Sequence, residues 1–266
     1  MKRFFPEFAI AFFVFSALFP AAIAQIAVPE SGRAAEGNQA RTRSQIHTEL
    51  STAYFQDGIY TAALEEANIA IAADSSFASA YGLRGLIYAA LGDRGAADSD
   101  FRRALSIEAS DPNINNNYGW FLCQQNNPAA QKAALPHFLK AIQNPLYATP
   151  EIAYINAGAC TLKQGDKETA RDFLLRAVRF SRDGSPQAQV YLAQIAYLEG
   201  SLVEARNRLL DIFQNNWVPS PEALWLAIRV EHRLNNSGEK ESLIAQLRRL
   251  YPASPEYQAY LKGTYE

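Results

Sequence analysis

The segment Ala53-Tyr54-Phe55-Gln56-Asp57-Gly58 decides the fold, because its glycine starts a spacing of small residues that recurs along the chain. Ala63 follows Gly58 by five residues and Ala70 follows it by twelve. The same offsets recur in three further sets: Gly92, Ala97 and Ala104; Gly165, Ala170 and Ala177; and Gly200, Ala205 and Ile212. In the last set isoleucine replaces the second alanine. A recurrence near 34 residues indicates stacked repeats rather than one closed core.

The helix starts repeat independently of the small residues. A capping side chain stands directly before a proline at Asp111-Pro112, Thr149-Pro150, Ser185-Pro186 and Ser220-Pro221, at spacings of 38, 36 and 35 residues. Proline is favourable at the first helical position, because the N–H that it lacks has no partner inside the helix. Each unit is therefore predicted to be helix, turn, helix, with a small residue where the two helices cross.

This pattern resembles the tetratricopeptide repeat (TPR) family, whose repeats have a 34-residue period with small and aromatic residues at these positions. The resemblance covers residues 44–217 and implies an all-α, right-handed superhelical solenoid of helix-turn-helix repeats. A further helix pair, over 221–234 and 239–250, has Lys240 near the place of the expected small residue. We expect residues 44–266 to form about six helix pairs, the last a degenerate capping repeat, because terminal repeats are commonly atypical.

The composition is that of a folded and weakly charged protein. Of the 266 residues, 48% are hydrophobic and 20% are charged, which excludes a disordered chain. The 25 basic and 27 acidic residues give a formal charge of −2, so the chain has no basic field that would bind nucleic acid. Two cysteines are too few for a disulfide-dense scaffold.

The first 24 residues are typical of a secretory signal. A basic start precedes an apolar run over residues 8–19, and a small-x-small cleavage pattern ends at Ala24, before Gln25. The run is shorter than the ~20 residues that cross a bilayer, so an uncleaved anchor is the weaker alternative. We expect residues 1–24 to be removed on export and residues 25–43, which lack a helical apolar stripe, to form a flexible leader.

Residues that could carry catalysis are scattered. The three histidines, His47, His137 and His232, fall in different units, and no metalloprotease, phosphate-loop, redox or nucleophile-elbow motif occurs. A cysteine and a histidine that meet only in space stay open as a nucleophile pair. We expect no enzyme activity, no metal or other cofactor, and no small-molecule substrate.

The two cysteines, Cys123 and Cys160, lie in the first helices of consecutive units, and such helices run side by side in a repeat stack. In an oxidising compartment this placement favours a disulfide between them. The alternative is a pair of small buried hydrophobic residues that never meet.

The most distinctive stretch is Asn115-Asn116-Asn117-Tyr118-Gly119-Trp120-Phe121-Leu122-Cys123, because asparagine is a poor helix former. In a structural interpretation these amides make polar contacts inside the repeat, and Asn115 caps the helix or faces water. In a binding interpretation Asn116, Trp120 and Gln124 share one helix face, at i, i+4 and i+8, that points into a concave groove. Both interpretations stay open.

The predicted groove is apolar with a few amides, which suits a hydrophobic segment of a protein partner. Side chains of the neighbouring first helices are expected to line it together with Asn116, Trp120 and Gln124: Thr52, Phe55, Leu86, Ile155, Ala159 and Tyr197. For each of these residues taken singly, core packing is the alternative.

A closer resemblance rests on the run 116–123 together with Asn156-Ala157-Gly158-Ala159-Cys160, the segment 224–229 and the segment 246–254. These stretches are similar to the PilW family of type IV pilus biogenesis/stability proteins, called PilF in some bacteria. The resemblance covers nearly the whole mature chain. It implies a periplasmic protein of six repeats at the outer membrane, which acts as a pilotin-like factor in the assembly or stability of the pilus secretin.

The sequence departs from that family at one place. Members typically carry a cysteine directly after the signal as a lipid attachment site, whereas Gln25 stands there in this chain. We therefore expect association with the outer membrane through the secretin or another partner, not through a lipid anchor. The alternative function is a periplasmic TPR scaffold of another envelope pathway, such as outer-membrane protein assembly or cytochrome maturation.

Overall fold

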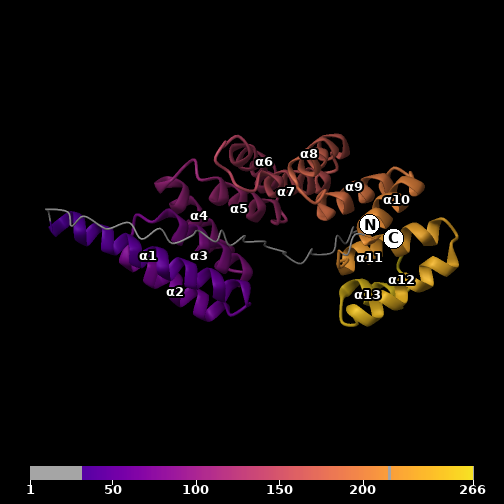
Figure 1. Cartoon of the computed structure of the whole chain (residues 1–266), viewed down its shortest axis with the longest axis horizontal. Coiled ribbons are helices and arrows are strands. Elements are labelled where there is room, and N and C mark those ends of the chain that lie inside the picture. Colours follow the sequence, from indigo (N-terminus) through magenta and orange to yellow (C-terminus); the bar gives the residue numbers. More distant parts are fainter. Residues whose placement is uncertain (1–31, 215–216, 266) are drawn as a thin grey trace. The chain divides into compact units, whose positions relative to one another are not determined.

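The computed structural model describes residues 32–214 and 217–265, and in these residues the chain has thirteen α-helices and no strand (Figure 1). The all-α solenoid of helix-turn-helix repeats predicted from the sequence is confirmed, and its right-handed sense stays a prediction. The predicted signal, residues 1–24, and residues 25–31 of the predicted leader lie outside the described residues. The chain divides into two compact units, residues 32–147 and residues 148–265.

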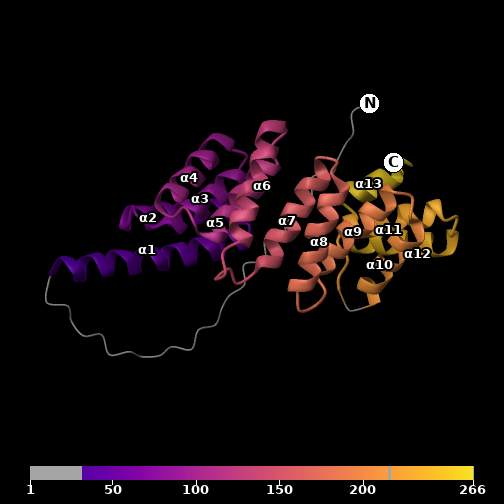
Figure 2. The ribbon, with the colours of Figure 1, turned by 90° about the horizontal axis from the view of Figure 1, so that it is seen from above.

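The first unit contains three helix pairs (Figure 2). They are α1 (Gly32–Gln56) with α2 (Tyr60–Ala73), α3 (Ala78–Ala90) with α4 (Arg94–Ile107), and α5 (Pro112–Cys123) with α6 (Pro128–Ile142). The first helix of each pair also packs on the first helix of the next, as α1 does on α3 and α3 on α5. Ala63 and Ala97, at the predicted small positions, and Ala134 on α6 are fully buried, so the two helices of each pair can approach closely.

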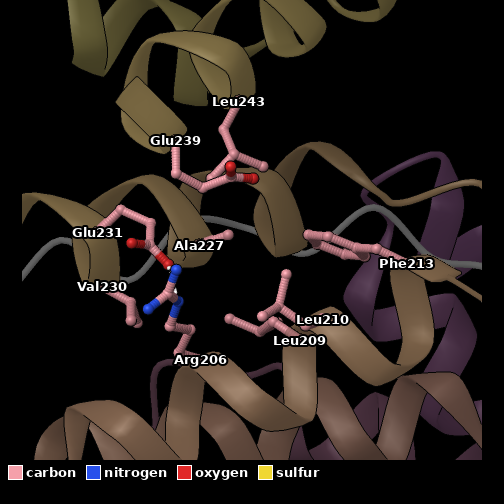
Figure 3. Close-up of a pocket in the computed structure, with 9 residues that line it drawn as sticks. All are labelled: Arg206, Leu209, Leu210, Phe213, Ala227, Val230, Glu231, Glu239 and Leu243. Atoms are coloured by element: carbon pink, nitrogen blue, oxygen red, sulfur yellow. Dashed lines mark ion pairs between the residues drawn. The ribbon is translucent and has the colours of Figure 1, made fainter. Parts of the chain in front are cut away.

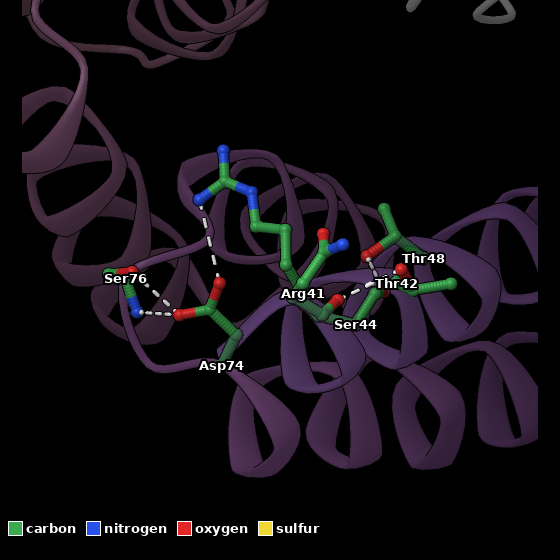
Figure 4. Close-up of polar contacts among 7 residues, drawn as sticks. Arg41, Thr42, Ser44, Thr48, Asp74 and Ser76 are labelled. Atoms are coloured by element: carbon green, nitrogen blue, oxygen red, sulfur yellow. Dashed lines mark hydrogen bonds and ion pairs between the residues drawn. The ribbon is translucent and has the colours of Figure 1, made fainter. Parts of the chain in front are cut away.

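Helix α1 corrects the predicted leader, because it begins at Gly32 and makes residues 32–43 helical. The segment holds three alanines and three arginines, which have high helix propensity, so it continues the helix without an apolar stripe. Arg41 anchors it to the turn before α3, because its Nη1 lies 3.5 Å from Asp74 Oδ2 (Figure 4). Its guanidinium carbon also lies 4.8 Å from the Phe77 ring centroid. Hydrogen bonds from Ser76 lower the pKa of Asp74 and keep this anchor charged.

The second unit also contains three helix pairs. They are α7 (Pro150–Lys163) with α8 (Lys167–Phe180), α9 (Pro186–Leu198) with α10 (Leu202–Gln214), and α11 (Pro221–Arg233) with α12 (Ser237–Leu250). A short helix, α13 (Pro255–Leu261), packs on α11. Leu174, Ile195, Leu224 and Ile228 are fully buried in this unit.

The turns explain the recurring glycine. Four turns between paired helices hold a glycine with φ between 74° and 91°: Gly58, Gly92, Gly165 and Gly200. This left-handed region is unfavourable for residues with a Cβ, and asparagine tolerates it better than most. The last pair uses Asn235, at φ 56°, in the same place, so it departs from the repeat in sequence while it keeps the turn.

Three of the four predicted proline-linked caps form. Asp111, Ser185 and Ser220 accept a hydrogen bond from the backbone N–H three residues ahead, at 2.8, 3.4 and 3.3 Å. The cap predicted at Thr149 is wrong, because no side-chain bond forms there.

Two helix crossings are close enough to require glycine. A Cβ added at Gly158 of α7 would lie 2.6 Å from Leu174 Cγ and 3.2 Å from the backbone oxygen of Ala170. At Gly119 of α5 it would lie 2.8 Å from Phe138 Cε1. These distances leave no room for a methyl group unless a neighbour moves.

Gly158→Ala is therefore expected to lower the free energy of unfolding by about 1–3 kcal/mol, as overpacking of a core does. Gly238→Ala is the matched control, since no heavy atom lies within 4 Å of a Cβ built at that helical position. The control should leave stability unchanged or raise it by up to ~1 kcal/mol through helix propensity. Urea unfolding followed by circular dichroism measures both, and equal stabilities of the two variants would contradict the close crossing.

Candidate functional site

The asparagine run at the start of α5 builds a buried polar network. Asn115 is fully buried, and its Nδ2 donates to the backbone oxygens of Ala109, at 3.0 Å, and Asp111, at 2.8 Å. Its Oδ1 lies 3.0 Å from Nδ1 of His137 on α6. Because the amide nitrogen is used by two carbonyls, Oδ1 is the acceptor and the imidazole Nδ1–H donates. The expectation that Asn115 caps the helix or faces water is thus wrong, since Asp111 is the cap.

Tyr118 extends this network to α4. Its hydroxyl donates to Asp98 Oδ1 at 2.7 Å, and its ring centroid lies 4.8 Å from that of His137 and 5.3 Å from that of Phe101. Burial, with help from the hydrogen bond to Asp98, raises the pKa of Tyr118 to about 12, and burial lowers the pKa of His137. Both groups are therefore uncharged at neutral pH, and together they tie α4, α5 and α6 to one another.

On α5, the face that is predicted to bind a partner changes from buried to solvent-exposed along the helix. Asn116 is only 5% exposed, and its Nδ2 lies 3.4 Å from Asn117 Oδ1. Trp120 is half-buried, and Gln124, at the C-terminal cap of α5, is exposed. The part of this face within reach of a partner is therefore its C-terminal half.

The other groove residues predicted in the first unit also take part in packing. Phe55 of α1 and Leu86 of α3 are partly buried against a common core cluster, and the Phe55 ring centroid lies 5.7 Å from that of Tyr60. Thr52 is half-buried, and its hydroxyl donates to the backbone oxygen of Thr48 at 2.8 Å. The structure thus brings Phe55 and Leu86 together on one cluster and leaves each of the three partly open to solvent.

In the second unit, Ile155 and Ala159 are half-buried on α7, and Tyr197 is half-buried on α9. The guanidinium carbons of Arg229 and Arg233, on α11, lie 5.0 and 4.9 Å from the centroid of the Tyr197 ring. Sequence reasoning missed both arginines. The repeat spacing could have pointed to Arg229. It stands 35 residues after Gln194, so it occupies on α11, the first helix of the last pair, the position that Gln194 occupies on α9.

Comparison with known proteins places this architecture in a family. Residues 78–111, which form α3 and α4, match the tetratricopeptide repeat family model. The type IV pilus assembly protein PilF of Pseudomonas aeruginosa is 27% identical over 214 residues, which is 80% of this chain and 83% of that protein. The crystal structure of PilW, described as a widely conserved type IV pilus biogenesis factor, superposes with a TM-score of 0.72 at 32% identity, covering 82% of this chain and 98% of that chain. This chain belongs to the PilW/PilF family.

The solved structure of Pseudomonas aeruginosa PilF supports the same assignment, with a TM-score of 0.70 and 26% identity over 85% of this chain and 99% of that one. A tetratricopeptide repeat protein from Parabacteroides merdae, 14% identical with a TM-score of 0.65, shares the fold. The resemblance to the PilW/PilF family inferred from the sequence is confirmed.

The two cysteines of this PilW/PilF family member lie in different units. Cys123 is on α5 and Cys160 is on α7, and each is 1% exposed. Neither is a free thiol. Their pairing with each other stays the prediction made from the sequence.

A pocket lies between α10, α11 and α12, lined mainly by leucine and other apolar side chains (Figure 3). Two of its polar members form an ion pair, because Arg206 Nε lies 2.9 Å from Glu231 Oε1, and Asn236, next to the pocket, donates to Glu231 Oε2 at 2.9 Å. The empty space is about 240 Å³, part of it open solvent, below the ~300–1,000 Å³ of small-molecule sites. The pocket is therefore a gap between packed helices of this PilW/PilF family member.

The described part of the chain has neither a cluster of metal-ligating side chains nor a helix suited to cross a membrane. Residues 32–214 and 217–265 contain no group of three or more histidine, cysteine, aspartate or glutamate side chains placed to hold a metal ion. Within the same residues, no helix combines the length and the apolar character that a bilayer span needs.

Proposed function

We propose that this chain is a protein-binding scaffold of type IV pilus assembly that promotes the assembly or stability of the outer-membrane pilus secretin. One observation carries the proposal: 32% identity to the pilus biogenesis factor PilW across 98% of that chain. A repeat fold alone is compatible with many partners, so the family relation directs the assignment to the pilus.

The described surface supports binding rather than catalysis. Stacked repeats offer an extended surface to a polypeptide, and half-buried aromatic residues such as Trp120 and Tyr197 are the side chains on which binding energy concentrates. Two titratable groups of the helices around Trp120, namely His137 and Tyr118, take part in the network that holds α4, α5 and α6 together. We propose that the chain has no enzymatic activity and needs no cofactor.

For localisation we propose export to the periplasm and attachment to the outer membrane through a protein partner. The support is the signal pattern over residues 1–24, with Gln25 rather than a cysteine after it. The intact mass of protein purified from the envelope tests both points. A chain that starts at Gln25 without an acyl group supports the proposal, and an acylated or uncleaved chain contradicts it.

The function is tested in a deletion strain scored for surface pili and for secretin multimers. Loss of both, with rescue by the wild-type chain, is the expected result. Trp120→Ala with Gln124→Ala should fail to rescue at normal protein level, because loss of a central tryptophan commonly costs about 2 kcal/mol or more of binding. Leu139→Ala, an exposed position on α6 of the same unit, is the matched control that should rescue.

Capture from an envelope extract separates the proposed partner from the alternative. Enrichment of the secretin by the wild-type chain, lost in the Trp120 and Gln124 variant, supports the proposal. Normal pili and multimers in the deletion strain, with recovery only of barrel-assembly or haem-handling proteins, would replace it by a scaffold of another envelope pathway.

A further inference from the structure

On α11, two positive charges meet at one aromatic ring. Arg229 and Arg233 stand one helical turn apart and place their guanidinium carbons 5.0 and 4.9 Å from the Tyr197 ring centroid. Nη1 of Arg233 also donates to the backbone oxygen of Tyr197 at 3.3 Å. Cation–π attraction holds both groups at the ring but leaves their charge uncompensated.

Arg229 differs from the other partly buried arginines of the described residues, each of which has a carboxylate partner. These pairs are Arg84 with Asp100, Arg171 with Glu199, Arg206 with Glu231 and Arg208 with Glu204. No described carboxylate pairs with Arg229, and its Nε is buried without a hydrogen-bond partner. Arginine stays protonated in proteins, so this is a partly buried cation that a bound anion would compensate.

An aromatic platform lies beside these charges on the same face of α11. Trp225 and His232, seven residues apart with Arg229 between them, both stack on Tyr265, with ring centroids 5.5 and 4.2 Å away. Tyr265 belongs to a non-helical segment that follows α13. The segment that carries Tyr265 therefore shows that this face accepts an aromatic side chain presented by a non-helical stretch of polypeptide.

We propose that one surface of the second unit binds a partner polypeptide in which a carboxylate closely follows an aromatic residue. This surface, called the α11 surface, consists of Trp225, Arg229, His232 and Arg233 on α11 together with Tyr197 on α9. Tyr265 fills the aromatic place until the partner displaces it. Consecutive Cα atoms are ~3.8 Å apart, so a carboxylate one or two residues from a ring on His232 is within reach of the arginines. The α11 surface shares Tyr197 with the predicted groove but includes none of Asn116, Trp120 and Gln124, and it rests on the proposed function only in that its ligand is a polypeptide.

The test uses a fluorescein-labelled hexapeptide, Leu-Lys-Gly-Thr-Tyr-Glu, which has the sequence of residues 261–266 and carries the required chemistry. Binding to the full chain is measured by fluorescence anisotropy. Tyr265→Ala, which vacates the platform, should bind the peptide about tenfold more tightly than the wild type. Adding Arg229→Met to that variant should weaken binding about tenfold or more, because a charge-assisted contact is lost.

Arg248→Met, on the exposed part of α12, is the matched control and should leave peptide binding unchanged. Three further peptides show which carboxylate is bound. One ends in glutamate with an amidated C-terminus, one in glutamine with a free C-terminus, and one in glutamine with an amidated C-terminus. A peptide with alanine in place of tyrosine tests the platform. Thermal unfolding of each variant establishes that it is folded, and Arg229→Lys supplies a conservative replacement that retains the charge.

Loss of affinity for the glutamine amide peptide and for the alanine peptide, together with partial rescue by Arg229→Lys, supports the proposal. Equal binding of charged and uncharged peptides, equal affinities of the Arg229→Met and Arg248→Met variants, or no binding to folded Tyr265→Ala would overturn it. These outcomes do not depend on pili or secretin, so failure here is distinguishable from failure of the proposed function.

Discussion

Replacing both cysteines by alanine is expected to lower the free energy of unfolding by about 4 kcal/mol, on the chain-entropy model for a loop of roughly 38 residues. The expectation follows from the predicted pairing of Cys123 with Cys160, which would restrict the unfolded chain. Neither residue is a free thiol, and each is 1% exposed, so reductant should act on the bond mainly after unfolding. Urea unfolding of the oxidised and reduced wild type, and of the variant, measures the effect.

Comparison of the reduced wild type with the alanine variant separates the contribution of the disulfide to the free energy of unfolding from that of side-chain packing. If the bond carries the effect, each single replacement should cost nearly as much as the double one, because either change removes the same cross-link. Alkylation of both thiols in denatured protein that was never reduced would show that the pair does not exist. Equal stabilities of the oxidised and reduced wild type would lead to the same conclusion.

The repeat architecture was predictable because steric requirements leave a trace in sequence. The helices of a pair cross so closely that only a small residue fits, as at Gly158, where a Cβ would meet Leu174 at 2.6 Å. The turns need a positive φ, so glycine recurs at Gly58, Gly92 and equivalent positions. Each requirement acts on one position and repeats with the period, which makes it visible without knowledge of the packing.

Features that depend on distant partners were not predictable in this way. The burial of Asn115 depends on His137, which follows 22 residues later on another helix, and local propensity gives no sign of that bond. The early start of α1 comes from helix propensity and the contact of Arg41 with Asp74, whereas the sequence argument looked for an apolar stripe. Arg229 was overlooked because the predicted groove was apolar, although it occupies a repeat position equivalent to a residue on α9.

Asn115→Ala is expected to lower the free energy of unfolding by about 2–4 kcal/mol, since each buried polar group that loses its partner costs ~1–3 kcal/mol. The replacement removes the donors to Ala109 and Asp111 and the acceptor for His137. Asn113→Ala is the matched control, because this asparagine is exposed on the same helix and its loss should change stability by no more than ~0.5 kcal/mol.

A double-mutant cycle with His137→Ala decides whether the loss comes from the network or from the cavity that the asparagine leaves. If the 3.0 Å contact between Asn115 Oδ1 and His137 Nδ1 carries part of the energy, the double variant loses less than the sum of the single losses. Strict additivity would assign the loss to the backbone carbonyls and the cavity. A loss no larger than that of Asn113→Ala would mean that the asparagine run has no structural role, and the face formed by Asn116, Trp120 and Gln124 would then be the main reason for these residues.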